Sequence, residues 1–195
     1  MPYQFSAKRG KHAMMTDLMT AEDRKALSFN KYEEEQTLPE LQDKIKRQPD
    51  QYKKEFRVHF KIFVDRLREF KLNPAKKEVV FIDYLKFMAH VSGVYRQQVA
   101  TFLSTEILNL LQQYHSILHP DVRMTLVTCL KVMRGKDVVP ASVVLPVFLK
   151  LFRCHDKELR KFLHSSIVKD LKDLNKKQKN SNLNKKLQNF ILNLL

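Results

Sequence analysis

The chain has 195 residues, of which 44% are hydrophobic and only three are glycine. It is therefore long enough for one domain with a buried core, but poorly suited to a hairpin-rich β fold or a glycine-rich phosphate loop. Lysine and arginine outnumber aspartate and glutamate by 36 to 21, a formal net charge of +15. Such a charge favours nucleic acid, an anionic membrane or an acidic protein as partner, unless the lysines only keep a helical surface soluble.

Two cysteines, Cys129 and Cys154, are too few for a disulfide scaffold. Both lie in apolar helical contexts, which indicates buried, reduced thiols. No run of about 18 apolar residues occurs, so we expect no membrane span. The N-terminus also lacks the apolar core of a signal peptide. These features predict an intracellular protein without membrane contact.

Residues 1–36 differ from the rest of the chain because they hold equal numbers of basic and acidic residues and no clear apolar stripe. We expect an extended or partly disordered arm there, which folds only on a partner. Its basic cluster, Lys8, Arg9, Lys11 and His12, could follow RNA or belong to a localisation signal. Residues 37–195 are predicted to form one helical-repeat domain, which continues beyond the chain end in longer relatives.

The first predicted helix starts at Thr37 and ends near Gln48, because Pro49 follows. Asp50 is expected to cap the next helix, which Asn73 and Pro74 end. The apolar residues of that helix recur at steps of three and four, which predicts one continuous buried face. They are Tyr52, Phe56, Phe60, Phe63, Leu67 and Phe70.

A third helix is predicted to end at Gly93. Its expected buried face consists of Val79, Ile82, Leu85, Met88 and Val91. Residues 95–114 continue as helix, with Ser104 as a point where it could be interrupted. Pro120 and Asp121 open another helix that ends at Gly135. Its expected inward residues are Val122, Leu126, Cys129, Leu130 and Met133.

Pro140 is predicted to open a helix that runs through Phe152. Pro146 lies inside this stretch, so either the helix begins later than Ala141 or the proline kinks it. Amphipathic helices follow over residues 156–175 and 183–195. The apolar ending, residues 189–195, suggests that the array continues or that a partner covers this edge.

Every predicted element is helical, and no segment alternates with a period of two for long. Helix starts near residues 75, 120 and 156 give spacings close to the period of about 40–47 residues in HEAT and armadillo arrays. We therefore expect an all-α, HEAT/armadillo-like helical-repeat array. A single irregular helical bundle is the alternative.

Catalytic and metal-binding patterns are absent from the sequence. Cys154, His155 and Asp156 form the one group that suggests a metal site, but no second pair of ligands lies nearby. A helix boundary explains this group better, with Cys154 packed inside and Asp156 capping the following helix. The histidines form no local nucleophile signature. We therefore expect no enzyme activity, metal, cofactor or small-molecule substrate.

A lysine- and asparagine-rich connector between residues 169 and 186 is the main functional signal. Lysines in a flexible loop can follow phosphates without reading base sequence, although a solvated loop would have the same composition. The candidate RNA-binding residues of the connector are Lys169, Lys172, Lys176, Lys177, Lys179, Lys185 and Lys186. A second candidate set, Arg47, Lys53 and Lys54, lies at a predicted corner between two helices.

Three segments carry a family resemblance: LPELQDKIKRQPDQYKKEF, LHPDVRMTLVTCLKVMR and LFRCHDKELRKFLHSSIVKDLKDLNKKQKNSNLNKKLQNF. They resemble the N-terminal region of the severe-depolymerisation-of-actin protein family, from about Leu38 to the end. The most specific parts are the run from Arg153 to Lys161 and the LQNF at Leu187 to Phe190.

This resemblance implies a nuclear and nucleolar scaffold for assembly of the large (60S) ribosomal subunit. The expected partners are pre-ribosomal RNA, assembly factors and ribosomal proteins, with a link to nuclear export of the particles. The alternative is a helical-repeat protein–protein adaptor of the transport type, without direct RNA contact.

Overall fold

The computed structural model describes residues 37–177 together with Asn182, Lys185 and Asn189. The described helices belong to one compact unit that begins at Leu38. The expected N-terminal arm with its basic cluster lies outside the described residues. The same holds for most of the expected last helix, residues 183–195, of which only Lys185 and Asn189 are described.

The described part of the chain is built from helices and contains no strand, which confirms the all-α fold class. Its elements are α3 (Leu38–Arg47), α4 (Lys53–Leu72), α5 (Val79–Val91), the short π-helix η1 (Arg96–Ala100), α6 (Thr101–Tyr114), α7 (Pro120–Gly135), α8 (Ala141–Leu151) and α9 (Lys157–Lys177).

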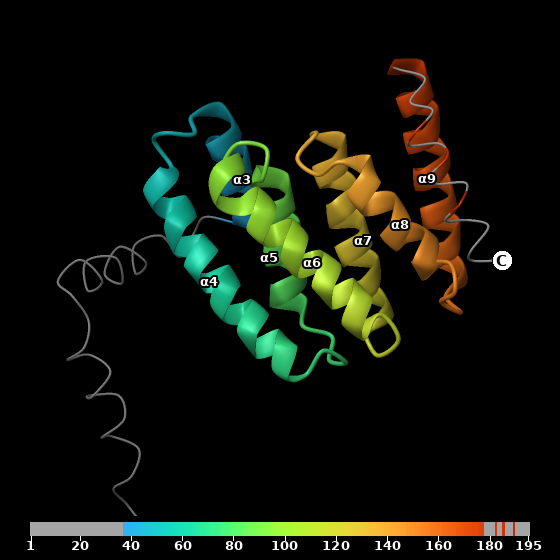
Figure 1. Ribbon diagram of the computed structural model, residues 1–195. Helices are drawn as coiled ribbons and strands as arrows, with labels where there is room; N and C mark the ends of the chain where they lie inside the picture. Colours follow the sequence, from blue (N-terminus) through green and yellow to red (C-terminus); the bar gives the residue numbers. More distant parts are fainter. Residues whose placement is uncertain (1–36, 178–181, 183–184, 186–188, 190–195) are drawn as a thin grey trace, which may run out of the picture. The chain divides into compact units, whose positions relative to one another are not determined.

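The helices are stacked in two layers, with α4, α6 and α8 in one and α3, α5 and α7 in the other (Figure 1). Contacts join consecutive helices and also alternate ones, such as α3 with α5, α5 with α7, and α6 with α8. In a helical-repeat array each unit buries its apolar face against its neighbours in this way. The arrangement is therefore that of the predicted array.

The predicted apolar face of α4 packs against α5 and the π-helix region. Its buried members are Phe56, Phe63, Leu67 and Phe70, while Tyr52 and Phe60 are partly buried. The ring of Phe81 on α5 lies between two of them, with its centroid 4.4 Å from that of Phe70 and 6.2 Å from that of Phe63. The prediction for α4 is confirmed.

Helix α5 differs from its prediction because it packs against α3, α4 and α7. Ile82, Leu85, Met88 and Val91 are buried as expected, but Val79 is 58% exposed. Phe81, Phe87 and Ala89 are buried in addition. A helix covered from several sides is apolar around most of its circumference, so a single stripe underestimates its buried surface.

Asp50 is not the cap of α4, contrary to expectation. The chain first makes a turn over residues 49–52, and Tyr52 occupies the N-cap position without a side-chain hydrogen bond. The hydroxyl of Tyr95 donates to the carbonyl oxygen of Pro49 at 2.7 Å. This bond holds the turn from another part of the array, so the start of α4 depends on tertiary contact and not on a local cap.

Two further local expectations need correction. The helical conformation changes at Thr101, where η1 gives way to α6, and not at Ser104. Ser104 lies inside α6 and its hydroxyl donates to the carbonyl oxygen of Thr101 at 3.1 Å, a bond that a helix tolerates. Helix α8 begins at Ala141 and includes Pro146 in its interior, so the later start is wrong.

Both cysteines are free and buried, as the sequence predicts. Burial raises the pKa of the Cys129 thiol to about 12. Burial also raises the pKa of Cys154, with a further small contribution from Asp156. The thiolate is the reactive form of cysteine, so these side chains act as packing groups.

In the folded protein at pH 8, iodoacetamide should alkylate Cys129 on the order of a thousand-fold more slowly than in urea, because the thiolate fraction is so small. The measurement is a time course of alkylation followed by mass spectrometry of the peptide that contains Cys129. Equal rates with and without urea would show that this thiol reaches solvent in the native state.

Candidate nucleic-acid interface

Lys169 and Lys172 lie in α9 within the predicted helix over residues 156–175, and α9 also includes Lys176 and Lys177, which were expected in a loop. Lys169, Lys172, Lys176 and Lys177 have helical backbone conformation, as does Lys185 further along. The sequence between residues 169 and 177 contains no glycine or proline, and lysine and leucine favour helix, so nothing local ends α9 earlier. Lys179 and Lys186 lie outside the described residues.

The start of α9 is attached to α7 by an ion pair. Asp156 accepts a hydrogen bond from the backbone N–H of Leu159 at 3.0 Å and another from Arg123 of α7 at 3.1 Å. The Leu159 N–H is the main reason that the pKa of Asp156 lies below its ordinary value, and Arg123 lowers it further. The expectation that Cys154 packs and Asp156 caps is confirmed.

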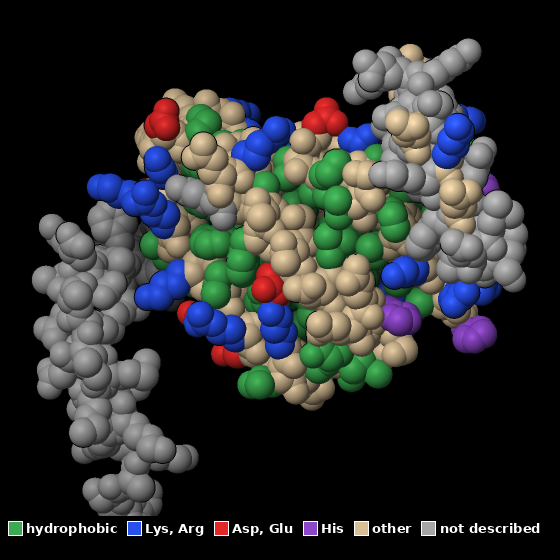
Figure 2. Space-filling model, in the orientation of Figure 1, with side chains coloured by type: hydrophobic (Ala, Val, Ile, Leu, Met, Phe, Trp, Pro, Cys, Tyr) green, Lys and Arg blue, Asp and Glu red, His purple; other side chains and the backbone are tan. Residues whose placement is uncertain are grey.

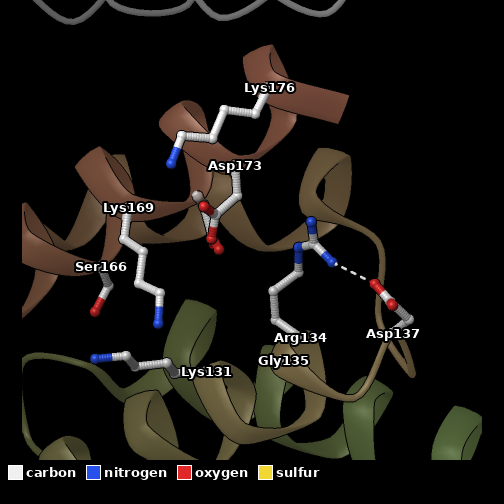
Figure 3. Close-up of a pocket in the computed structure, with 9 residues that line it drawn as sticks. Lys131, Arg134, Gly135, Asp137, Ser166, Lys169, Asp173 and Lys176 are labelled. Carbon is white, nitrogen blue, oxygen red and sulfur yellow. Dashed lines mark hydrogen bonds and ion pairs between the residues drawn. The ribbon is translucent and has the colours of Figure 1, made fainter. Parts of the chain in front are cut away.

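A groove of about 360 Å³ runs between the C-terminal half of α7 and the second half of α9. Figure 3 shows Lys169, Asp173 and Lys176 of α9 on one side, and Lys131 and Arg134 of α7 on the other. Lys169 extends from α9 toward α7, where the Lys131 side chain runs crosswise below it. Several ammonium groups that line one groove raise its local positive potential, so this end of the groove favours an anionic ligand.

The cations of α7 are held in place by local contacts. The Lys131 ammonium lies 4.5 Å from the centre of the Phe162 ring on α9, a cation–π contact. Arg134 donates to Asp137 at 2.9 Å, just after the end of α7. Asp137 has a φ of 54°, a left-handed conformation that aspartate tolerates better than most residues.

Three carboxylates, Asp137, Asp170 and Asp173, line the groove and make it mixed in charge. Burial raises the pKa of Asp170, and the neighbouring Asp173 adds to this effect, while Arg134 and the nearby lysines oppose it. Within the described residues, Arg134 is paired with Asp137, whereas Lys131, Lys169 and Lys176 form no ion pair with another described residue. These three ammonium groups are therefore the ones available to an anion.

The other candidate residues whose side chains are described do not line this groove. Lys172 is exposed on α9 but does not line it. Arg47 ends α3 and Lys53 and Lys54 begin α4, all exposed. Figure 2 shows basic side chains around the rim of the visible face, over α3 and α4 on one side and near α9 on the other. The sequence candidates thus form two separate surfaces.

Lys131 and Arg134 were missed by sequence reasoning. They lie three residues apart on α7, beside the inward residues Leu130 and Met133. That spacing places both on one flank of the helix, which was a usable signal. The sequence does not say which neighbouring helix that flank faces, so it did not connect them to α9.

Neither a metal site nor a membrane segment is found among the described residues. No group of three or more histidine, cysteine, aspartate or glutamate side chains there is arranged to hold a metal ion. None of the described helices combines the length and apolar character needed to cross a bilayer.

Comparison with known proteins assigns the array to a family. A family model described as "SDA1, HEAT repeat" matches residues 87–195, more than half of the chain. The chain belongs to the SDA1 family. This confirms the resemblance suggested by the sequence, and the HEAT repeat agrees with the stacked helices. The SDA1 match includes every residue that lines the α7–α9 groove, whereas Arg47, Lys53 and Lys54 precede it.

Individual SDA1 relatives come from distant eukaryotes. Protein SDA1 homolog of Xenopus laevis is 39% identical over 158 residues, which is 81% of this chain and 23% of the relative. Protein SDA1 homolog of Drosophila melanogaster is 38% identical over 160 residues, 82% of this chain and 22% of the relative. Protein sda1 of Schizosaccharomyces pombe is 28% identical over 159 residues. The chain therefore spans less than a quarter of the length of the SDA1 relatives that it matches.

Proposed function

We propose that this chain is a non-enzymatic scaffold in the nuclear and nucleolar assembly of the large (60S) ribosomal subunit. It binds pre-ribosomal particles through ribosomal RNA and protein contacts and takes part in their export. Membership of the SDA1 family and the HEAT-repeat fold support this role. The observation that carries the RNA contact is that Lys131, Lys169 and Lys176 line one groove between α7 and α9.

The groove suits phosphate groups better than bases. Lysine ammonium groups contact phosphate oxygens as point charges and read no sequence. Among the described residues no phenylalanine or tyrosine lines the groove, so bases find no aromatic ring to stack on there. Specificity would then come from the shape of the particle. Asp170 and Asp173 limit how much negative charge the groove accepts.

A protein–protein adaptor without RNA contact is the second candidate function. It is favoured by apolar side chains left exposed near helix ends. Leu72 is 87% exposed, Val79 58% and Ile117 52%. A contiguous apolar patch marks a surface that a partner protein covers, so the adaptor requires these side chains to contribute to one interface.

Reversing the three available groove charges should weaken RNA binding. We expect Lys131→Glu, Lys169→Glu and Lys176→Glu together to lower the affinity for an oligouridylate on the order of 100-fold. If each lysine neutralises one phosphate, the slope of log K against log salt should become shallower by about 0.7 per lost contact. The measurement is fluorescence anisotropy between about 50 and 200 mM salt.

The matched control reverses three exposed lysines elsewhere, Lys61, Lys76 and Lys86, with the same change in net charge. This control variant should keep most of the affinity for the oligouridylate and most of the slope of log K against log salt. An unchanged slope in the groove variant would contradict direct RNA contact and favour the adaptor. At the level of particles, replacing Lys176, Lys177, Lys179, Lys185 and Lys186 with glutamate should weaken association with large-subunit precursors.

A further inference from the structure

A second recess lies away from the α7–α9 groove, where α6, α8 and the turn before α9 meet. It consists of two adjacent depressions, and His115 lines both. The first has a volume of about 130 Å³ and is lined by Leu111 of α6 and by Val147 and Leu151 of α8. The second is larger, about 540 Å³, and is lined by charged and polar residues.

One wall of the larger depression is a fixed ion pair between Arg123 and Asp156. The Arg123 side chain is only 10% exposed and donates to the carbonyl oxygen of His115 at 2.7 Å as well as to Asp156. Asp156 is the one carboxylate among the described residues that line this depression, and it already accepts from Arg123 and from the Leu159 N–H. The acid is therefore engaged inside the fold, while His155 and Arg153, which has a further interaction of its own, are exposed at the rim.

The smaller depression has aliphatic walls with a cation at its edge. Leu111, Val147 and Leu151 are all buried side chains, and Lys150 is exposed beside them. A cavity of about 150 Å³ with such walls is large enough for a benzene-sized apolar group. This depression can therefore take one apolar side chain of a partner, next to positive charge on both sides.

We propose that this recess is a docking site for a peptide segment of a partner protein in which an aliphatic residue adjoins glutamate or aspartate. The aliphatic side chain enters the depression between α6 and α8, and the carboxylates face Lys150 and Arg153. A nucleic acid fits less well, because it carries no aliphatic side chain to fill the depression between α6 and α8, whose described walls include Leu111, Val147 and Leu151.

This recess shares no lining residue with the α7–α9 groove. RNA and peptide can therefore be bound at the same time by one array, and the peptide site does not depend on the proposed RNA contact.

The test uses a fluorescein-labelled peptide that alternates one leucine with two glutamates, titrated with the full chain. Two exposed cations are reversed together, Lys150→Glu and Arg153→Glu, and the matched control carries Lys61→Glu and Lys86→Glu. We expect the recess variant to bind the peptide at least tenfold more weakly and the control to change less than twofold. A separate variant, Gln112→Phe, blocks the apolar depression without a charge change and should weaken binding to a similar degree.

Variant peptides and an oligouridylate provide the results that would contradict the proposed peptide site. Peptides with glutamine in place of glutamate, or alanine in place of leucine, should each lose most of the affinity; full binding by either would overturn the proposal. The Lys131, Lys169 and Lys176 triple variant should bind the peptide normally. If the Lys150 and Arg153 variant instead loses oligouridylate as strongly as peptide, the recess is a nucleic-acid surface and the peptide assignment is wrong. Circular dichroism confirms that each variant remains helical.

Discussion

Replacing Phe81 with alanine should lower the free energy of unfolding by about 3–5 kcal/mol. The Phe81 side chain is fully buried and lies between the rings of Phe63 and Phe70, so its removal opens a cavity between α4 and α5. Aromatic contacts add to the loss beyond the buried area alone. The measurement is urea unfolding followed by circular dichroism.

The controls for this effect are apolar residues of the same region that the structure leaves exposed. Val79→Ala and Leu72→Ala should each change stability by less than about 0.5 kcal/mol, because both side chains are largely in solvent. Phe81→Leu should cost less than Phe81→Ala, since part of the cavity stays filled. Equal destabilisation by Val79→Ala and Phe81→Ala would contradict the packing of α5.

Replacing Arg123 with alanine should cost about 3 kcal/mol, the second large effect. Arg123 is 8% exposed, and it joins α7 to the carbonyl oxygen of His115 and to Asp156 before α9. Its removal leaves a half-buried carboxylate and a carbonyl oxygen without this donor, and breaking a buried pair from one side is costly. The measurement is again urea unfolding.

Substitutions at Asp156 separate its two roles. Asp156→Asn keeps an oxygen for the Leu159 N–H but loses the charge toward Arg123, whereas Asp156→Ala loses both. We expect alanine to be more destabilising than asparagine by about 1 kcal/mol, the usual value of a helix cap. If the two variants are equally stable, Asp156 does not cap α9.

The same carboxylate should make stability depend on pH. Because the folded-state pKa of Asp156 lies below its ordinary value of 3.8, its contribution is fully present above that value. The contribution is lost as the pH falls through the folded-state pKa. The parent protein should therefore lose more stability than the Asp156→Asn variant on acidification below about pH 4. If the unfolding free energies of the two proteins change with pH in parallel, Asp156 is not the source of this pH dependence.

Local patterns in the sequence predicted α4 and α7 well. In α7, the inward residues and both ends agree with the structure, because Pro120 starts the helix and an apolar residue recurs every three or four positions. The boundary before α9 was also predictable, since an aspartate cap acts within three residues. By contrast, the start of α4 depends on Tyr95, which lies far away in the sequence.

The candidate site was predictable only in part. The sequence indicates Lys169 and Lys176 as candidates, but it predicts the helix only as far as residue 175 and does not include Lys131 or Arg134. It also grouped Lys172 with the others, although this side chain does not line the groove. Which lysines face one another depends on how α7 and α9 pack, and helical periodicity does not contain that information.

By itself, the sequence determined the all-α class, the order of the helices, the burial of both thiols and the family. These properties depend on residues three or four positions apart, or on short specific segments. Only the tertiary structure decided that α5 is covered on several sides, that lysines of α7 and α9 line one groove, and that Arg123 closes the wall of a second recess. The reason is that each of these features joins side chains from different helices, and their distance is set by packing across the array.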